Sequence, residues 1–335
     1  MAILRHILTL SLASLLAGCY ENFDPKVDTA PVLCINSLIT AGEPIEVHVT
    51  HTWMFSDQNA ELDHAVDDAT VTIYANGTPV PADYLPREGD EIRIVAESRR
   101  YGRAEAAVTV PKPVPFSTVS FVPEVLSVWR EPDRPMAGGV DFNLIVRATI
   151  ADRHKADDYF QLACDWKPPV CYDVVDGDYD ASHEPYAFLS PGTFDFDAEP
   201  IFKEHIGVFE SVMGNDDVDR MIFTDHLFAG REYTLNLHFN NATYSVNSPE
   251  FSPELYDCCV TLTLASVSRS YYDRAIYVWQ RDTGILGDLG DLGFAEPIWG
   301  YSNVSTGAGT VAARSLSTYT LPLKNFIEAA VNAGR

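Results

Sequence analysis

The chain has 335 residues, of which 46% are hydrophobic and 11% aromatic. Its formal net charge is −25 at pH 7, from 48 acidic and 23 basic side chains. This hydrophobic content is typical of a folded protein and excludes a disordered acidic chain. The negative field repels phosphate-rich polymers, so nucleic acid is excluded as a partner, and the charge serves mainly to keep the protein soluble.

Residues 1–18 have the layout of a secretory signal. Arg5 supplies the positive charge, and the apolar run at 7–16 is too short to span a membrane core of roughly 30 Å. The following letters "LAGC" match the bacterial lipobox, in which Cys19 is acylated and becomes the new N-terminus. We therefore expect acyl chains on Cys19 to hold the protein on a lipid bilayer, with 19–30 as a linker. An ordinary cleaved signal with an incidental cysteine is the alternative.

Residues 31–112 alternate short apolar stretches with turn sequences. The stretches "VLCINSLI", "IEVHVTHTW", "ATVTIYAN", "IRIVAE" and "AEAAVTVP" are rich in β-branched residues, and "TAGEP", "NGTPVP" and "REGDE" separate them. Turns at this spacing predict a β-sandwich of the immunoglobulin or transthyretin kind. The Cys…Trp…Cys spacing of true immunoglobulin domains is missing, so only the general architecture follows.

Residues 113–315 predict a second, larger antiparallel β domain, entered through the proline-punctuated segment 110–119. The stretches "DFNLIVRATIAD", "DYFQLACDW", "REYTLNLHF" and "DCCVTLTLASVS" indicate its strands, with an irregular acidic insertion at about 172–222. A helix is expected near 268–282, and 316–335 is a C-terminal tail or a second short helix. The predicted fold class is therefore mainly β, with one or two short helices.

The helix near 268–282 carries an aromatic stripe. Tyr271, Tyr272, Ala275 and Trp279 recur at helical spacing, and a serine at 268 or 270 caps the first turn. Such a stripe more often packs into a core than forms a binding site. We expect it to face the protein interior.

The cysteines allow several disulfides, because an exported protein meets an oxidising environment. Cys164 and Cys171 flank a short loop and can pair with each other, or either can pair with Cys258 or Cys259. The sequence does not fix this connectivity. Once Cys19 is acylated an odd number remains, so one thiol is free or intermolecular. Cys34, inside a strand-like stretch, is expected to be a buried small hydrophobe.

The acidic insertion holds the best candidate for a metal site. Asp176, Asp178 and Asp180 alternate, and carboxylate oxygens at this spacing suit Ca²⁺. Ala181 and Ala187 stand where an EF-hand needs glycine and glutamate, so the loop is not an EF-hand. The alternative is a solvated acidic loop without a metal.

Aromatic residues also gather in and around the insertion. They either stack on a sugar or protein partner or anchor loops on the sheet, and the second interpretation is favoured. The set is Trp166, Tyr172, Tyr179, Tyr186 and Phe188.

No catalytic motif is present in the sequence. There is no H-E-x-x-H, P-loop or G-x-G-x-x-G, and "GYSNV" at 300–304 lacks the second glycine of a nucleophile elbow. His48 and His51 are three apart on a predicted strand and point to opposite faces, so they do not chelate together. We therefore expect no catalytic residue and no cofactor apart from the Ca²⁺ candidate.

The order of motifs resembles a known family. "VTLTLASVSRSYYDRAIYV" and "FAEPIWGYSNVSTGAGTVAA" near the end, with "VLCINSLITAGEPIEVHVTHT", "DDATVTIYANG" and "YGRAEAAVTVPKPVPFSTV" earlier, are similar to the Bacteroidetes outer-membrane lipoproteins catalogued as domain of unknown function 4249. The resemblance covers nearly the whole mature chain. The chain departs from the family where it reads "TGAGTVAARS" instead of a "GGLGIFGA"-like ending, and in its "LGDLGDLG" repeat.

The resemblance implies an outer-membrane lipoprotein that faces the periplasm or, as favoured, the cell surface. It implies a place beside a TonB-dependent transporter and brings no enzyme activity or catalytic residue. "DTA" at 28–30 matches the short O-glycosylation pattern of such organisms, with Thr29 as acceptor.

Three functions follow in order of preference. The first is a non-catalytic binding or accessory component of a TonB-dependent nutrient transporter. The second is an adhesive or structural surface lipoprotein. The third is a metal-dependent hydrolase that uses the acidic insertion.

Overall fold

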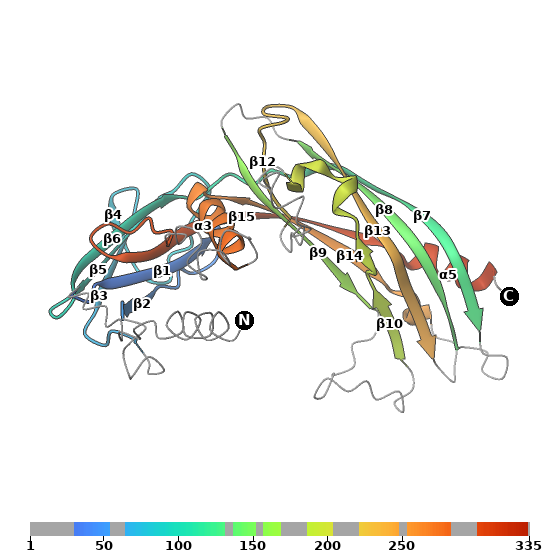
Figure 1. The fold of residues 1–335 in the computed structure, drawn as a ribbon, viewed down its shortest axis with the longest axis horizontal. Coiled ribbons are helices and arrows are strands. Elements are labelled where there is room, and N and C mark those ends of the chain that lie inside the picture. The colour runs from blue at the N-terminus through green and yellow to red at the C-terminus, as the bar shows by residue number, and fades with distance from the viewer. Residues whose placement is uncertain are drawn as a thin grey trace, which may run out of the picture. The chain divides into compact units, whose positions relative to one another are not determined.

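A computed structural model describes residues 30–53, 64–130, 137–151, 157–168, 186–203, 221–247, 253–282 and 300–333. Contacts divide the chain after Pro31, and Val32–Arg335 forms one compact unit. Within the described part this unit contains three β-sheets and two α-helices (Figure 1). The expected lipidation, glycosylation and calcium residues lie outside the described part; they are Cys19, Thr29, Asp176, Asp178 and Asp180.

A four-stranded antiparallel sheet has the order β4-β3-β5-β6. Its strands are β3 (Thr70–Ala75), β4 (Thr78–Val80), β5 (Glu91–Ser98) and β6 (Gly102–Thr109). Asn76 and Gly77 have φ angles of 50° and 79°, the left-handed conformation that a two-residue hairpin requires. The Asn-Gly pair therefore forms the turn between β3 and β4.

The second sheet has six strands and is built from both ends of the chain (Figure 1). In order across the sheet they are β12 (Met221–Thr224), β9 (Tyr159–Lys167), β14 (Cys259–Val267), β15 (Ala308–Pro322), β1 (Leu33–Thr40) and β2 (His48–His51). Residues 308–314 of β15 pair in parallel with β1, and residues 314–322 pair antiparallel with β14. β15 therefore lies inside this sheet and joins β1 and β2 from the start of the chain to β14, β9 and β12.

The first hydrophobic core lies between the four-stranded sheet and the β1–β15 pair. Ile35 of β1, Ile92 and Ile94 of β5, and Val311 and Ala313 of β15 are all completely buried in it. Burying one aliphatic side chain of this size stabilises the fold by about 1.5–3 kcal/mol. The N-terminal sandwich is therefore completed by residues that lie far away in sequence.

Gly309 lies where the backbones of β1 and β15 come close together. Its φ of +106° is unfavourable for other residues, and a Cβ there would lie 2.2 Å from the Ile35 carbonyl oxygen. A side chain at this position would push the two strands apart. The glycine is required by the parallel pairing.

β14 pairs with residues 314–322 of β15 and ends before residues 308–313. Along that part of β15, side chains form hydrogen bonds with the strand backbone. Asn303 Nδ2 donates to the Val311 carbonyl over 2.8 Å, and the Val311 N–H donates to Asn303 Oδ1 over 2.9 Å. Ser270 Oγ also donates to the Val311 carbonyl, and the Ala313 N–H donates to Ser268 Oγ. Because Val311 and Ala313 are fully buried, these side chains satisfy backbone groups that water does not reach.

The third sheet has five strands and carries the second core. Its strands are β10 (Tyr186–Ser190), β13 (Glu232–Asn247), β8 (Gly138–Ala151) and β7 (Phe116–Arg130) in order, with β11 (Thr193–Phe194) paired to β13. Phe142 and Leu144 of β8 and Leu235 and Leu237 of β13 alternate with outward residues and are fully buried. They share one core with Leu262 of β14.

The helices of the described segments are α3 (Arg269–Asp282) and α5 (Lys324–Ala333). The short 3-10 turns there are η1 (Phe196–Ala198), η2 (Pro200–Lys203) and η3 (Pro253–Tyr256). Ser268 caps α3 by accepting the Tyr271 N–H over 3.3 Å. Ile327 and Val331 of α5 are buried in the second core. None of the helices in the described segments is long and apolar enough to cross a membrane.

A buried carboxylate fixes the turn before β5. The Arg87 N–H, the Tyr84 hydroxyl and the Asn76 side-chain amide all donate to Asp90, at 2.7–2.8 Å. The Arg87 backbone hydrogen bond is the main reason that the pKa of Asp90 lies below its ordinary value. The ionised form of Asp90 is therefore favoured in the folded state.

The mainly β fold with two helices is confirmed. The helix expected near 268–282 is α3. Residues 316–322, expected in a tail, instead continue β15, and α5 follows them. The expected domain boundaries at 112 and 315 stay predictions.

Candidate functional site

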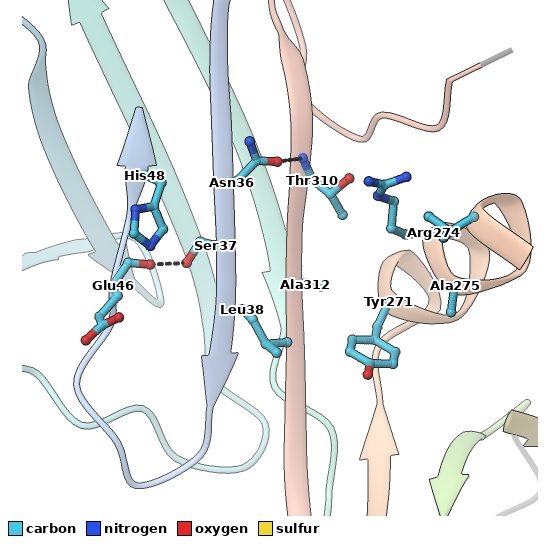
Figure 2. A pocket seen from close by; sticks show the side chains of 11 residues that line it. Asn36, Ser37, Leu38, Glu46, His48, Tyr271, Arg274, Ala275, Thr310 and Ala312 are labelled. Atoms are coloured by element: carbon cyan, nitrogen blue, oxygen red, sulfur yellow. Dashed lines mark hydrogen bonds between the residues drawn. The ribbon is translucent and has the colours of Figure 1, made fainter. Parts of the chain in front are cut away.

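An open pocket of about 430 Å³ lies on the outer face of the six-stranded sheet, between α3 and strands β15, β1 and β2 (Figure 2). Its lining comes from both ends of the chain and consists of Asn36, Ser37, Leu38, Glu46, His48, Tyr271, Arg274, Ala275, Val278, Thr310 and Ala312. The parallel pairing of β1 with β15 is what brings these segments together.

Strand register places the polar lining residues in one row. His48 of β2 lies opposite Asn36 of β1, and Asn36 lies opposite Thr310 of β15. The three positions span two strand spacings, about 10 Å. Arg274 extends this row, because its guanidinium points from α3 toward Thr310 (Figure 2).

Hydrogen bonds fix the walls of the pocket. Ser37 Oγ donates to the Glu46 carbonyl over 2.7 Å, which holds the chain leading into β2 against β1. The Thr310 N–H donates to Asn36 Oδ1 over 3.1 Å. On the helix side, the Tyr271 hydroxyl donates to Gln161 Oε1 over 2.5 Å. The pocket is therefore held by β1, β2, β9, β15 and α3 together.

The pocket floor is apolar. Leu38 is 42% exposed although it lies on a strand next to the core. Beside it, Ala312 lies opposite Leu38 on β15, and Ala275 and Val278 contribute the helix side. An apolar floor with a polar rim is typical of small-ligand sites.

Two opposite charges stand at the two ends of the pocket. Arg274 lies over the Tyr277 ring, with Cζ 5.4 Å from its centroid. In the described part of the chain no carboxylate pairs with Arg274 and no cation pairs with Glu46. Free opposite charges suit a ligand that carries both.

The described residues of the pocket contain no nucleophile hydrogen-bonded to a base. Ser37 is 7% exposed and its hydroxyl is used on a backbone carbonyl. The Tyr271 hydroxyl is used on Gln161. His48 and Glu46 are exposed polar groups at the rim. Such an arrangement can bind a ligand, but it lacks the paired groups that nucleophilic catalysis needs.

The cysteines of the described segments are free thiols, and the strand register separates Cys164 from two of its proposed partners. Cys164, Cys258 and Cys259 are free. Cys164 lies opposite Leu262 in β14, three residues from Cys259, which places the two cysteines about 10 Å apart along the strands. A disulfide needs Cα atoms within about 7 Å, so Cys164 does not pair with Cys258 or Cys259. Cys171 lies outside the described residues.

Burial makes the two inner thiols unreactive. Burial is the largest cause of the shift in both cases, and it raises the pKa of Cys164 to about 12 and the pKa of Cys258 to about 12. Both thiols stay protonated at physiological pH. Cys34 is half-buried, and burial also raises its pKa.

The two histidines and the tryptophan considered in the sequence analysis lie in different parts of the fold. His48 lines the pocket, whereas His51 stacks on Tyr101 with ring centroids 4.7 Å apart, so the two histidines lie on different faces. Trp166 packs on Phe142 and Phe239 at the core and is not a surface platform. Over the described segments, no group of three or more His, Cys, Asp or Glu side chains is arranged to hold a metal.

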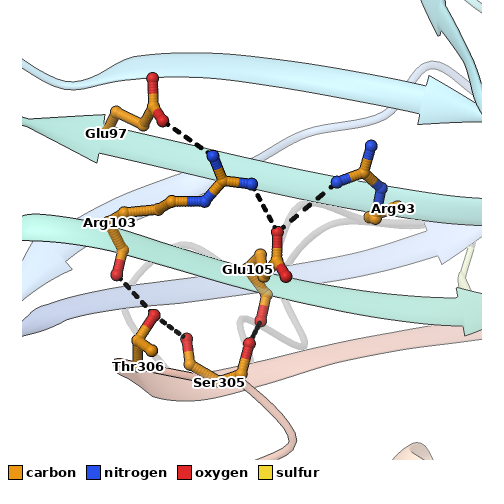
Figure 3. A network of polar contacts seen from close by, with 6 residues as sticks. All are labelled: Arg93, Glu97, Arg103, Glu105, Ser305 and Thr306. Carbon is orange, nitrogen blue, oxygen red and sulfur yellow. Dashed lines mark hydrogen bonds and ion pairs between the residues drawn. The ribbon is translucent and has the colours of Figure 1, made fainter.

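A second polar cluster has a structural role. Figure 3 shows its members, which are Arg93, Glu97, Arg103, Glu105, Ser305 and Thr306. Arg103 bridges Glu97 and Glu105 at 3.0 and 2.7 Å. Thr306 Oγ1 donates to the Arg103 carbonyl and Ser305 Oγ to that of Glu105. Exposed ion pairs contribute little to stability. The main role of the cluster is therefore played by the Ser305 and Thr306 hydrogen bonds, which attach the segment before β15 to β6.

The family described as domain of unknown function (DUF4249) matches residues 20–320. The chain belongs to this family. The matched range includes every residue that lines the pocket of this DUF4249 member. No curated protein and no solved structure matches the chain.

Proposed function

We propose that this DUF4249 protein is an outer-membrane lipoprotein, anchored through Cys19, that serves as a non-catalytic binding component of a TonB-dependent nutrient transporter. The lipobox supports the anchor. The resemblance to outer-membrane lipoproteins supports the location, with the surface-facing side favoured, and suggests the transporter as partner.

The pocket between α3 and the β2-β1-β15 face is the observation that carries the binding role. It combines an apolar floor, a row of hydrogen-bonding side chains and two free opposite charges. A ligand captured there can be handed to a transporter in the same membrane. The absence of a nucleophile–base pair among the described lining residues favours capture over conversion.

A gentle detergent pull-down of the tagged, lipidated protein from its own outer membrane tests the proposal. Cys19→Ala is the control, because it removes the anchor and leaves Val32–Arg335 unchanged. We expect a stoichiometric TonB-dependent transporter in the wild-type eluate and none in the Cys19→Ala eluate. Wild-type protein recovered alone or as a homopolymer would contradict the proposal and favour an adhesive role.

A further inference from the structure

We propose that the pocket binds short peptides with free termini, about three residues long, with the carboxyl terminus held by Arg274. This inference rests on the proposed binding role and names the ligand class for the same pocket. It follows from the order of charged, polar and apolar side chains along the pocket.

Arg274 defines the carboxylate end. Its planar guanidinium forms two parallel hydrogen bonds to a carboxylate, which no other side chain offers with the same fixed geometry. The chain has 48 acidic against 23 basic residues, yet no carboxylate in the described part pairs with Arg274. The Tyr277 ring holds the guanidinium through a cation–π contact. An arginine that has no carboxylate partner among the described residues is available to an external carboxylate.

Asn36 and Thr310 define the middle. The Asn36 side-chain oxygen, Oδ1, accepts the Thr310 N–H. Among the described residues, the Asn36 side-chain N–H groups and the Thr310 hydroxyl have no hydrogen-bond partner. These groups can bond to the amide groups of a ligand backbone. The exposed Leu38 side chain and Ala312 lie beside them and can pack against apolar ligand side chains.

Glu46 and His48 define the other end. The Glu46 carboxylate is exposed at the rim and can bind a protonated amino terminus. From His48 on β2 to Thr310 on β15 the polar row of the pocket spans about 10 Å. An extended peptide covers about 3.3–3.6 Å per residue, so three residues match this span.

A thermal-shift titration of the full chain in mild detergent tests the inference. The probe is a pool of free tripeptides with alanine at both ends and an apolar amino acid in the middle, compared with the C-amidated and the N-acetylated pools. Binding to the folded state raises Tm, and the rise grows with the logarithm of the ratio of ligand concentration to Kd. We expect the free pool to raise Tm and the amidated pool to bind about tenfold more weakly.

Two variants locate the contacts. Arg274→Gln should bind the free pool about tenfold more weakly and no longer distinguish it from the amidated pool. Arg281→Gln is the matched control, because Arg281 lies on α3 over the same Tyr277 ring but does not line the pocket. Glu46→Gln should remove the preference for free over acetylated amino termini.

Equal binding of the free and amidated pools to the wild type would overturn the inference, and this comparison needs no variant to fold. Equal affinity of Arg274→Gln and wild type would also overturn it. No peptide binding by a protein that still co-purifies with a transporter would overturn this inference alone and leave the proposed function standing.

Discussion

Asn303→Ala should destabilise the protein, because this side chain takes the place of a strand beside β15. The substitution removes two hydrogen bonds to Val311, each with a net value of about 0.5–1.5 kcal/mol. The Val311 carbonyl keeps its bond from Ser270, but the Val311 N–H is left buried without an acceptor. Together these losses amount to about 2–4 kcal/mol. For a unit of this size that corresponds to a fall of about 3–6 °C in Tm.

Thermal unfolding followed by tryptophan fluorescence measures this effect. Asn325→Ala is the control, since Asn325 is exposed on α5 and should change stability by no more than about 0.5 kcal/mol. Asn303→Asp gives a second arm: it keeps the acceptor for the Val311 N–H but faces the Val311 carbonyl with an oxygen. Its destabilisation should be larger at pH 7 than at pH 4, where protonation restores a donor. If Asn303→Ala had the same Tm as Asn325→Ala, the reasoning that Asn303 stabilises the fold through its hydrogen bonds to Val311 would be refuted.

Three further predictions concern the fold. Gly309→Ala should separate β1 from β15 and lower Tm more than Gly77→Ala, whose Cβ would meet no atom within 4 Å, although both positions have positive φ; similar Tm values would contradict the parallel pairing. The pKa of Asp90 is lowered in the folded state, so its stabilisation is present above about pH 4 and is lost as the pH falls through the folded pKa. The Tm difference between wild type and Asp90→Asn should therefore stay constant from pH 7 to about pH 5 and shrink below about pH 4, and a difference that does not change with pH would count against this. Cys164 and Cys258 should resist iodoacetamide in the native protein at pH 8 and react once it is denatured without reductant, as read by peptide mass spectrometry; failure to react after denaturation would indicate a disulfide.

Local sequence patterns predicted most of the strands and α3 correctly. Alternation in "DFNLIVRATIAD" and "REYTLNLHF" marks β8 and β13, because one face of each is buried and the other exposed. The Asn76-Gly77 pair marks a hairpin for steric reasons that act within a few residues. Such signals depend only on neighbouring residues and can be read without the fold.

The pocket could not be predicted in this way. Asn36 and Thr310 become neighbours only because β1 pairs in parallel with β15, and parallel strands need no local turn that the sequence could show. Arg274 lies on a helix whose aromatic stripe was expected to face the interior. Trp279 does so, whereas Tyr271 lines the pocket. One signal in the sequence could have pointed to Arg274. It has no Asp or Glu three or four residues away on the helix, although acidic residues outnumber basic ones in the chain.

The pairing of β15 with both β1 and β14 also links the site to the rest of the fold. α3 is held against β15 by Ser268 and Ser270, and the pocket lies between this helix and β1. Changes that loosen this attachment should therefore weaken ligand binding as well as stability. Asn303→Ala combines both readouts in one variant.

We propose that the protein meets its ligand or partner in the cell at the pocket face. Photo-crosslinking in the native outer membrane tests it most directly, with a photoreactive amino acid at Leu38 on the pocket floor and, as control, at Leu227, which is 53% exposed and does not line the pocket. We predict a specific adduct from position 38, a peptide or the transporter, and none from position 227. The same adducts from both positions, or none from position 38, would contradict the claim.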